Sequence, residues 1–146
     1  MNRKRTVHEV AFRLNMDMTM QIAPRLGALD ASLSQQQLRT MRLIWSHDQV
    51  TLVDIAQTLK RDKSQVVRLI DELSKADMVA REPNPKDGRS KILKLTPKGE
   101  AFFTKIEDIE AQFSDQLVDN IDPKDLDAFF KVADRLSENL KKIDSP

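Results

Sequence analysis

Four polar side chains gather in one short stretch of the chain, at Lys63, Ser64, Gln65 and Arg68. Ser and Gln can hydrogen-bond the edges of nucleic-acid bases, Arg can pair with guanine or phosphate, and Lys suits phosphate. If the stretch is helical, the free backbone N–H groups at its start also attract phosphate. The alternative is an ordinary amphipathic helix with a polar outer face, and this helix taken alone favours that alternative.

A second basic cluster follows at Lys86, Arg89 and Lys91, next to a stretch that two prolines stiffen. An Arg on the tip of such a turn can enter the minor groove of DNA, where narrow A·T stretches concentrate negative potential. Asp87 can orient the Arg89 guanidinium through a charge-assisted hydrogen bond. A solvated turn is the other interpretation, because Asp and Gly are common in turns.

Helix-start signals predict the elements that position the first cluster. Ser34, Thr51 and Asp62 are candidate N-caps, and each is followed at the third helical position by a residue that can close a capping box. A short helix after Thr51, the polar turn 60–62 and a second helix from Lys63 give the outline of a helix-turn-helix.

The second cluster belongs to a predicted β-hairpin, the wing. We expect strands over 78–82 and 90–95 around a turn-rich tip at 83–88, with Leu93 off the polar–apolar alternation. A helix pair, a wing and positive charge follow one another directly along the chain. Together they favour DNA binding over the separate alternatives.

Long amphipathic helices flank this region. The first is expected over 7–28, with Pro24 ending or kinking it, and two more begin at Thr96 and Asp122, each followed by Pro. The last helix carries an apolar seam with alternating steps of three and four, at Leu126, Phe129, Ala133, Leu136, Leu140 and Ile143. One small lobe cannot bury all of these stripes, so we expect an oligomer; packing within one chain is the alternative.

Composition narrows the class of protein. The chain has 146 residues, no Cys and a net charge of +1, but residues 60–98 carry eleven Lys and Arg against six Asp and Glu, whereas residues 99–146 carry six against twelve. A basic middle beside an acidic end is expected when one lobe meets phosphate and the other does not. Without a signal peptide or an apolar membrane span, we expect a soluble, cytoplasmic protein.

Catalytic motifs are missing from the sequence. The three glycines are isolated, so no phosphate-binding loop is present, and no Gly-x-Ser-x-Gly elbow occurs. His8 and His47 are the only histidines, which makes a tight zinc site unexpected without Cys. We therefore expect no enzyme, no metal and no cofactor.

The chain resembles the MarR family of bacterial winged-helix regulators in segments that run from the helix-turn-helix through the wing. The matching segments are LVDIA at 52–56, DKSQVVRLIDEL at 62–73, NPKDGRSK at 84–91 and LKLTPKG at 93–99. The flanking helices fit the family layout too. The predicted fold is thus mainly α with a small β-hairpin wing: a DNA-binding lobe at 34–99 between dimerisation helices at 1–33 and 100–146.

The resemblance implies a sequence-specific transcriptional regulator, a homodimer that represses by binding an inverted repeat in double-stranded DNA. It implies that the helix from Lys63 reads the major groove, that Arg89 reads the minor groove and that Asp87 orients Arg89. A winged-helix module that binds another protein is the alternative. The sequence departs from the family pattern at Ala76-Asp77, before the first strand, and at Asn84, where Asp is common.

Many members of the family release DNA when a small aromatic or phenolic acid binds. In this chain Met16, Met20, Met41, Trp45 and His47 are the candidates for lining an adaptable apolar pocket with a polar group at its mouth. Met and Trp at helical spacing are otherwise core residues. The identity of an effector and the target genes are not encoded in these residues.

Overall fold

A computed structural model describes residues 5–30 and 32–143 of the chain. The first four and last three residues, which fall in the predicted dimerisation segments, lie outside the described residues, as does residue 31. The elements are α1 (Val7–Gly27), α2 (Gln35–Ser46), α3 (Leu52–Leu59), α4 (Lys63–Lys75), β1 (Val79–Pro83), β2 (Lys91–Leu95), α5 (Pro97–Leu117) and α6 (Pro123–Lys142).

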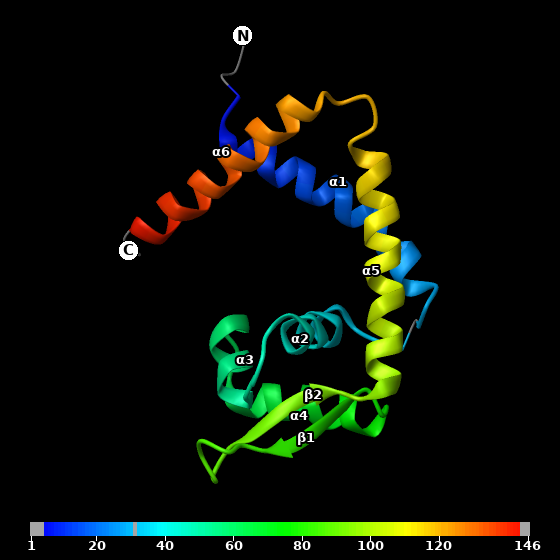
Figure 1. Ribbon diagram of the computed structural model, residues 1–146, viewed down its shortest axis with the longest axis vertical. Helices are drawn as coiled ribbons and strands as arrows, with labels where there is room; N and C mark the ends of the chain where they lie inside the picture. The colour runs from blue at the N-terminus through cyan, green and yellow to red at the C-terminus, as the bar shows by residue number, and fades with distance from the viewer. Residues whose placement is uncertain (1–4, 31, 144–146) are drawn as a thin grey trace. The chain divides into compact units, whose positions relative to one another are not determined.

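A winged helix-turn-helix lobe is built from α2, α3, α4 and the β1–β2 hairpin, which lie together in Figure 1. Its core is a continuous apolar cluster to which the first half of α5 contributes; the fully buried side chains include Met41, Ile55, Val66, Ile70, Leu73, Phe103 and Ile106. The predicted fold class, mainly helical with a β-hairpin wing, is confirmed.

Capping boxes begin α1, α2, α3 and α4. At α2 the Ser34 Oγ accepts from the Gln37 N–H (3.2 Å) and the Gln37 Oε1 accepts from the Ser34 N–H (2.7 Å). Thr51 and Asp54 make the same exchange at α3, as the sequence predicts, and Thr6 with Glu9 adds one at α1. Each box satisfies backbone donors that a helix start leaves without partners.

The turn between α3 and α4 depends on one left-handed residue. Lys60 ends α3 with φ 51° and ψ 48°, and the Arg61 N–H bonds back to the Ala56 carbonyl at 3.0 Å. At the start of α4, the Gln65 Oε1 accepts from the Asp62 N–H at 3.4 Å. The chain therefore reverses within a few residues and presents the N-terminal end of α4 outward.

α4 ends in a Schellman motif. Asp77 has φ 58°, its N–H bonds the Ser74 carbonyl at 3.0 Å, and the Met78 N–H bonds the Leu73 carbonyl at 2.9 Å. This position favours glycine, so the departure noted at Ala76-Asp77 is accommodated by Asp in the left-handed region. Met78 and Leu73 are both buried, which adds the apolar contact that such motifs usually carry.

The two wing strands pair antiparallel, from Val79 opposite Leu95 to Pro83 opposite Lys91. β1 starts and ends one residue later than predicted. Leu93 and its neighbour Ile92 point to opposite faces of β2 and are both buried, while a third segment lines the edge of the strand, where the Leu93 N–H donates to the Val50 carbonyl at 2.8 Å. Both faces of β2 are covered there, so a two-residue period no longer holds.

The segment that joins the wing to α5 is held by close backbone contacts. The Thr96 Oγ1 caps α5 by accepting from the Gly99 N–H (3.0 Å), and it donates to the Asp77 carbonyl (2.5 Å). A Cβ at Gly99 would lie 2.2 Å from the Met78 carbonyl oxygen. Only glycine lets the first turn of α5 approach the chain so closely, which gives a physical reason for Gly in the LTPKG segment.

The chain divides into two compact units, residues 1–110 and 111–146. Neither α1, in the first unit, nor α6, in the second, has a buried residue. The predicted split into a lobe at 34–99 and dimerisation helices on either side stays a prediction. No helix within the described part of the chain combines the length and apolarity needed to cross a membrane.

Candidate nucleic-acid interface

The first turns of α4 expose the four polar side chains that the sequence singles out. Lys63, Ser64, Gln65 and Arg68 are all exposed, and Val66 between them is fully buried. The helix is therefore anchored by its apolar face while its N-terminal polar face meets solvent. A helix held in this way can enter a major groove without unpacking the lobe.

Arg68 forms an ion pair on this face. Its Nε donates to the Glu72 Oε1 at 3.2 Å, one helical turn further on, while its side chain stays 83% exposed. The Glu72 Oε2 accepts from the Gln37 Nε2 at 2.9 Å. Glu72 was not singled out by sequence reasoning, because the contact to Gln37 joins residues far apart in the chain.

The wing tip, residues 84–90, is ordered by side chains that bond its own backbone. The Asn84 Oδ1 accepts from the Lys86 N–H (3.0 Å) and its Nδ2 donates to the Ser90 Oγ (2.8 Å). The Asp87 Oδ1 accepts from the Arg89 N–H (2.9 Å). These are Asx-type turns, which fix a loop without strands or core. Asn84 donates a bond here that an ionised Asp could not.

Asp87 bonds the backbone of Arg89 and not its guanidinium. The sequence suggests a bond to the guanidinium, but the carboxylate holds the backbone N–H of Arg89, and no ion pair joins the two side chains among the described residues. The reason is geometric, because an Asp side chain in a turn readily reaches the N–H two residues ahead. The guanidinium is left exposed at the tip.

A cleft of about 220 Å³ brings the helix and the wing together. Lys63 at the start of α4 and Arg89 and Lys91 of the wing line it, with Arg81 of β1 and the start of α3. Arg81 is held by Asp71 at 2.5 Å and by Ser74 at 3.5 Å. Sequence reasoning missed Arg81, although its polar position on β1 was visible in the strand pattern.

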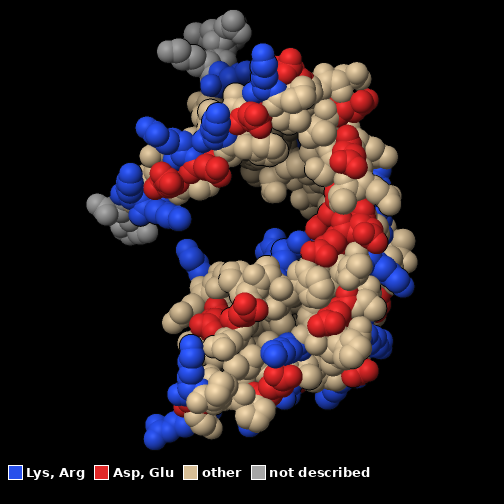
Figure 2. Space-filling view, in the orientation of Figure 1, with Lys and Arg blue, Asp and Glu red and all other residues tan. Residues whose placement is uncertain are grey.

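Lys86 does not line this cleft but is exposed on the wing tip. Figure 2 shows Lys and Arg side chains projecting where Figure 1 places the end of the hairpin. The helix face, the cleft and the wing tip form one candidate interface, and its predicted members all lie on it: Lys63, Ser64, Gln65, Arg68, Lys86, Asp87, Arg89 and Lys91.

The residues predicted to form an effector pocket are not brought together. Met41 is fully buried in the core, whereas Met16 and Met20 are 47% and 69% exposed on α1. Trp45 donates from Nε1 to the Glu107 carboxylate at 2.7 Å and packs against Phe103. Helical spacing groups residues on one helix, but it cannot tell which helix face meets a cavity.

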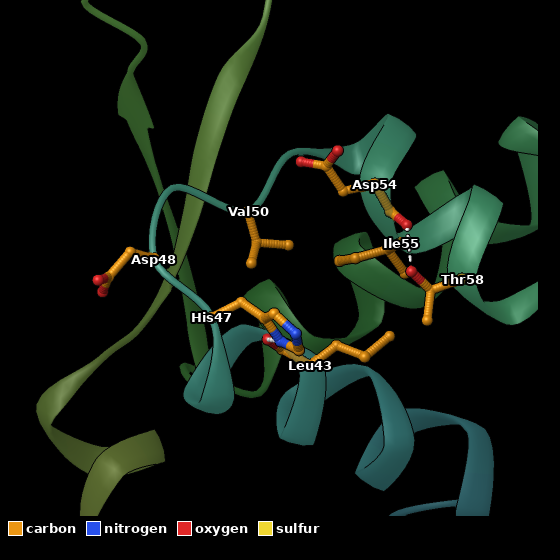
Figure 3. A pocket seen from close by; sticks show the side chains of 7 residues that line it. All are labelled: Leu43, His47, Asp48, Val50, Asp54, Ile55 and Thr58. Carbon is orange, nitrogen blue, oxygen red and sulfur yellow. Dashed lines mark hydrogen bonds between the residues drawn. The ribbon is translucent and has the colours of Figure 1, made fainter. Parts of the chain in front are cut away.

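His47, the fifth predicted pocket residue, lines a separate cavity. Figure 3 shows its imidazole below Val50, in a cavity of about 310 Å³ between α2 and α3. Its Nδ1 lies 2.9 Å from the Ser46 Oγ and 3.1 Å from the Leu43 carbonyl oxygen. Asp54, on the far side, is engaged in the cap of α3. The polar groups of His47 and Asp54 therefore form hydrogen bonds within or at the ends of their own helices.

A larger cavity, which we call the α1–α2–α5 cavity, measures about 470 Å³ and was not predicted. Its walls are apolar residues of all three helices with several polar groups among them, and it is lined by Asn15, Thr19, Ile22, Ala23, Leu26, Gly27, Asp30, Leu33, Gln35, Leu38, Arg39, Arg42, Phe103 and Ile106. Arg42 lies over the Phe103 ring and pairs with Glu110. The volume fits a small molecule.

Asp30 at the edge of this cavity stays ionised. Hydrogen bonds from the Ser32 hydroxyl (2.5 Å) and the Ser32 N–H (2.9 Å) lower the pKa of its carboxyl below the ordinary value. The cavity is therefore lined by charged groups of both signs, the Asp30 carboxylate and the guanidinium groups of Arg39 and Arg42. No group of three or more metal-ligating side chains occurs among residues 5–30 and 32–143.

Comparison with known proteins agrees with this geometry. Residues 33–91 match the model of the MarR family. A curated relative, the HTH-type transcriptional regulator YdgJ of Bacillus subtilis (strain 168), is 22% identical over 113 residues, which cover 77% of this chain and 69% of that protein.

Solved structures share the fold over most of the chain. Wild-type MarR (apo form) from E. coli gives a TM-score of 0.73 at 20% identity and covers 92% of this chain and 98% of that one. The S. aureus MepR–DNA complex gives 0.71 at 20% identity, with 96% and 100% covered. The match at residues 33–91 thus places the likeness to the MarR family in the winged helix-turn-helix lobe, and the solved structures show that the fold is shared over most of the chain.

Proposed function

We propose that this protein is a transcriptional regulator that binds double-stranded DNA in a sequence-specific way. One observation carries the proposal: the cleft in which the start of α4 and the basic wing meet, so that one duplex can contact both. α4 then reads the major groove through Ser64, Gln65 and Arg68, and Arg89 reaches the minor groove. The likeness to MepR in a complex with DNA supports this assignment.

The protein acts as a homodimer on an inverted repeat. Support comes from the exposed apolar side chains of α1 and of α6, each of which lacks a buried residue. Two-fold symmetry places the two recognition helices roughly 34–36 Å apart, about one helical turn of DNA. Each half-site then meets one copy of the α4–wing surface.

A small aromatic or phenolic acid in the α1–α2–α5 cavity relieves repression. The cavity supplies apolar walls from Leu38 and Phe103 and cationic groups from Arg39 and Arg42. Arg39 is exposed and has no ion-pair partner among the described residues, so it is available for a carboxylate. Since α2 belongs to both the cavity and the winged lobe, an occupant can bias the spacing of the two recognition helices.

A selection from random duplex DNA tests the proposal. We expect the full-length protein to enrich a palindromic sequence, and its affinity for that sequence, measured by fluorescence anisotropy, to exceed its affinity for a scrambled duplex by about 10³-fold or more. Both affinities should fall with added salt. Failure to enrich any sequence, or equal affinity for both duplexes, would overturn the proposal.

A further inference from the structure

We propose that Glu72 is a positioning residue that gives Arg68 its base specificity; this inference rests on the DNA-binding function proposed above. Each oxygen of the Glu72 carboxylate has its own partner. Oε1 accepts from the Arg68 Nε at 3.2 Å, and Oε2 accepts from the Gln37 Nε2 at 2.9 Å. The carboxylate therefore links the outer face of α4 to a second helix, α2.

The anchoring from α2 distinguishes this contact from an ordinary surface ion pair. An exposed pair one helical turn apart is weak, because two long side chains must be ordered for a screened attraction. Here Gln37 is already fixed, since its Oε1 accepts from the Ser34 N–H at 2.7 Å and its N–H donates to the Ser34 Oγ. The bond from Gln37 therefore restricts the Glu72 carboxylate, and the Glu72 carboxylate in turn restricts the Arg68 guanidinium.

The bond to Nε leaves the terminal nitrogens of Arg68 for DNA. These two nitrogens form the fork that matches O6 and N7 of guanine, and such a bidentate contact is directional. The side chain is 83% exposed even with the Glu72 bond in place. With its Nε bonded to Glu72, the Arg68 guanidinium is preorganised to contact a base through its two terminal nitrogens. Without that bond, the side chain could also turn towards the phosphates.

The position of Glu72 also carries an electrostatic cost. Glu72, Arg68 and Gln65 line one cleft of about 300 Å³, together with Arg61 and the N-cap Ser34. A carboxylate there repels the phosphate backbone and lowers affinity for every sequence alike. The benefit that offsets this repulsion is discrimination between sequences.

The test compares the parent protein with Glu72→Gln, Glu72→Ala and Gln37→Ala on the selected palindrome and on a scrambled duplex over a range of salt. For both Glu72 variants we expect the ratio of the two affinities to fall about tenfold, because scrambled DNA binds more tightly and the palindrome less. The salt slope on scrambled DNA should steepen by about one, as the released Arg68 takes a phosphate. Gln37→Ala should lower the ratio less.

Glu82→Gln is the matched control. It removes one carboxylate from the wing, where Glu82 pairs with Lys94 at 3.1 Å, while Arg68 pairs with Glu72. We expect it to raise both affinities equally and to leave their ratio unchanged. A repeated selection with Glu72→Gln should relax one base pair in each half-site and no other.

Two results would overturn the inference while leaving DNA binding intact. One is an unchanged affinity ratio in Glu72→Gln. The other is a lowered melting temperature with equal losses on both duplexes, which indicates that Glu72 only supports the fold. A parent protein without sequence preference would instead overturn the proposed function itself.

Discussion

Gln65 and Arg89 bring different chemistry to the proposed interface. A Gln side chain on α4 carries no charge and contributes through directional hydrogen bonds to base edges, whereas the Arg89 guanidinium carries a full charge into a region of negative potential. Both side chains are exposed. Removing each should therefore change a different measurable property of DNA binding.

We expect Arg89→Ala to weaken binding to the selected palindrome about tenfold or more and to reduce the salt slope. Gln65→Ala should alter which base is preferred and leave the salt slope near that of the parent. Fluorescence anisotropy over a salt series measures both. Lys105→Ala, an exposed basic position on α5, is the control and should change neither property. If both substitutions changed the affinity and the salt slope equally for all sequences, the separate roles assigned to Arg89 and Gln65 would be refuted.

The absence of a side chain at Gly99 allows the first turn of α5 to pack closely against the backbone at Met78, just before β1. A Cβ at this position would meet the Met78 carbonyl oxygen at 2.2 Å, and backbone cannot rotate away as a side chain can. We expect Gly99→Ala to lower the free energy of unfolding by about 2 kcal/mol. Urea denaturation measures the change.

Gly88→Ala is the control for that substitution. Nothing lies within 4 Å of a Cβ at Gly88, and its φ is not positive. We expect its free energy of unfolding to stay within about 0.5 kcal/mol of the parent. Equal stability of the two variants would show that the first turn of α5 relaxes away from Met78.

At the scale of elements, the Schellman motif that ends α4 contains Asp77, which adopts a left-handed conformation that glycine would adopt at lower cost. Asp77 at φ 58° costs more than glycine there, because its Cβ crowds the backbone. We expect Asp77→Gly to raise the free energy of unfolding by about 0.5–1 kcal/mol, as the hydrogen bonds of the motif use only backbone atoms. Thermal or urea denaturation checks the sign, and a lower stability would contradict the strain argument.

Local rules predicted the helix starts well. Ser34 and Thr51 were identified as caps because their partners lie three residues away, and both form the expected boxes. The same reasoning placed the helix-turn-helix and the wing. The alternation fails at Ile92 and Leu93 because both are buried although they point to opposite faces of β2, and the elements that cover the two faces cannot be read from the strand pattern.

Contacts between distant elements set the limit of prediction at the candidate site. The polar residues of α4 and the wing could be named from their types, but the Glu72–Gln37 bond spans 35 positions and depends on how α2 crosses α4. The α1–α2–α5 cavity likewise needs three helices to be placed before any residue can be assigned to it. Periodicity describes one helix at a time, so it grouped Met16 and Met20 with residues that lie elsewhere.

At the scale of the whole molecule, the exposed apolar side chains of α1 and of α6 support the proposed dimer. On α1, Phe12 is 60% and Met20 69% exposed; on α6, Phe129 is 56% and Leu140 67% exposed. Side chains of this kind on both helices leave more apolar area in water than a stable monomer usually tolerates. Under the proposed function the partner that covers these side chains is a second copy of this chain, since each copy would supply one α4 to a two-fold DNA site.

We expect Phe129→Asp to shift the protein from dimer to monomer at micromolar concentration, because a carboxylate buried in an apolar seam would lack a partner. Sedimentation velocity measures the state, and the shift should abolish tight binding to the palindrome while circular dichroism shows intact helices. Lys131→Asp, exposed on the opposite side of α6 from the seam, should remain dimeric. A parent protein that sediments as a monomer, or a Phe129→Asp variant that stays dimeric, would place the dimer contact elsewhere.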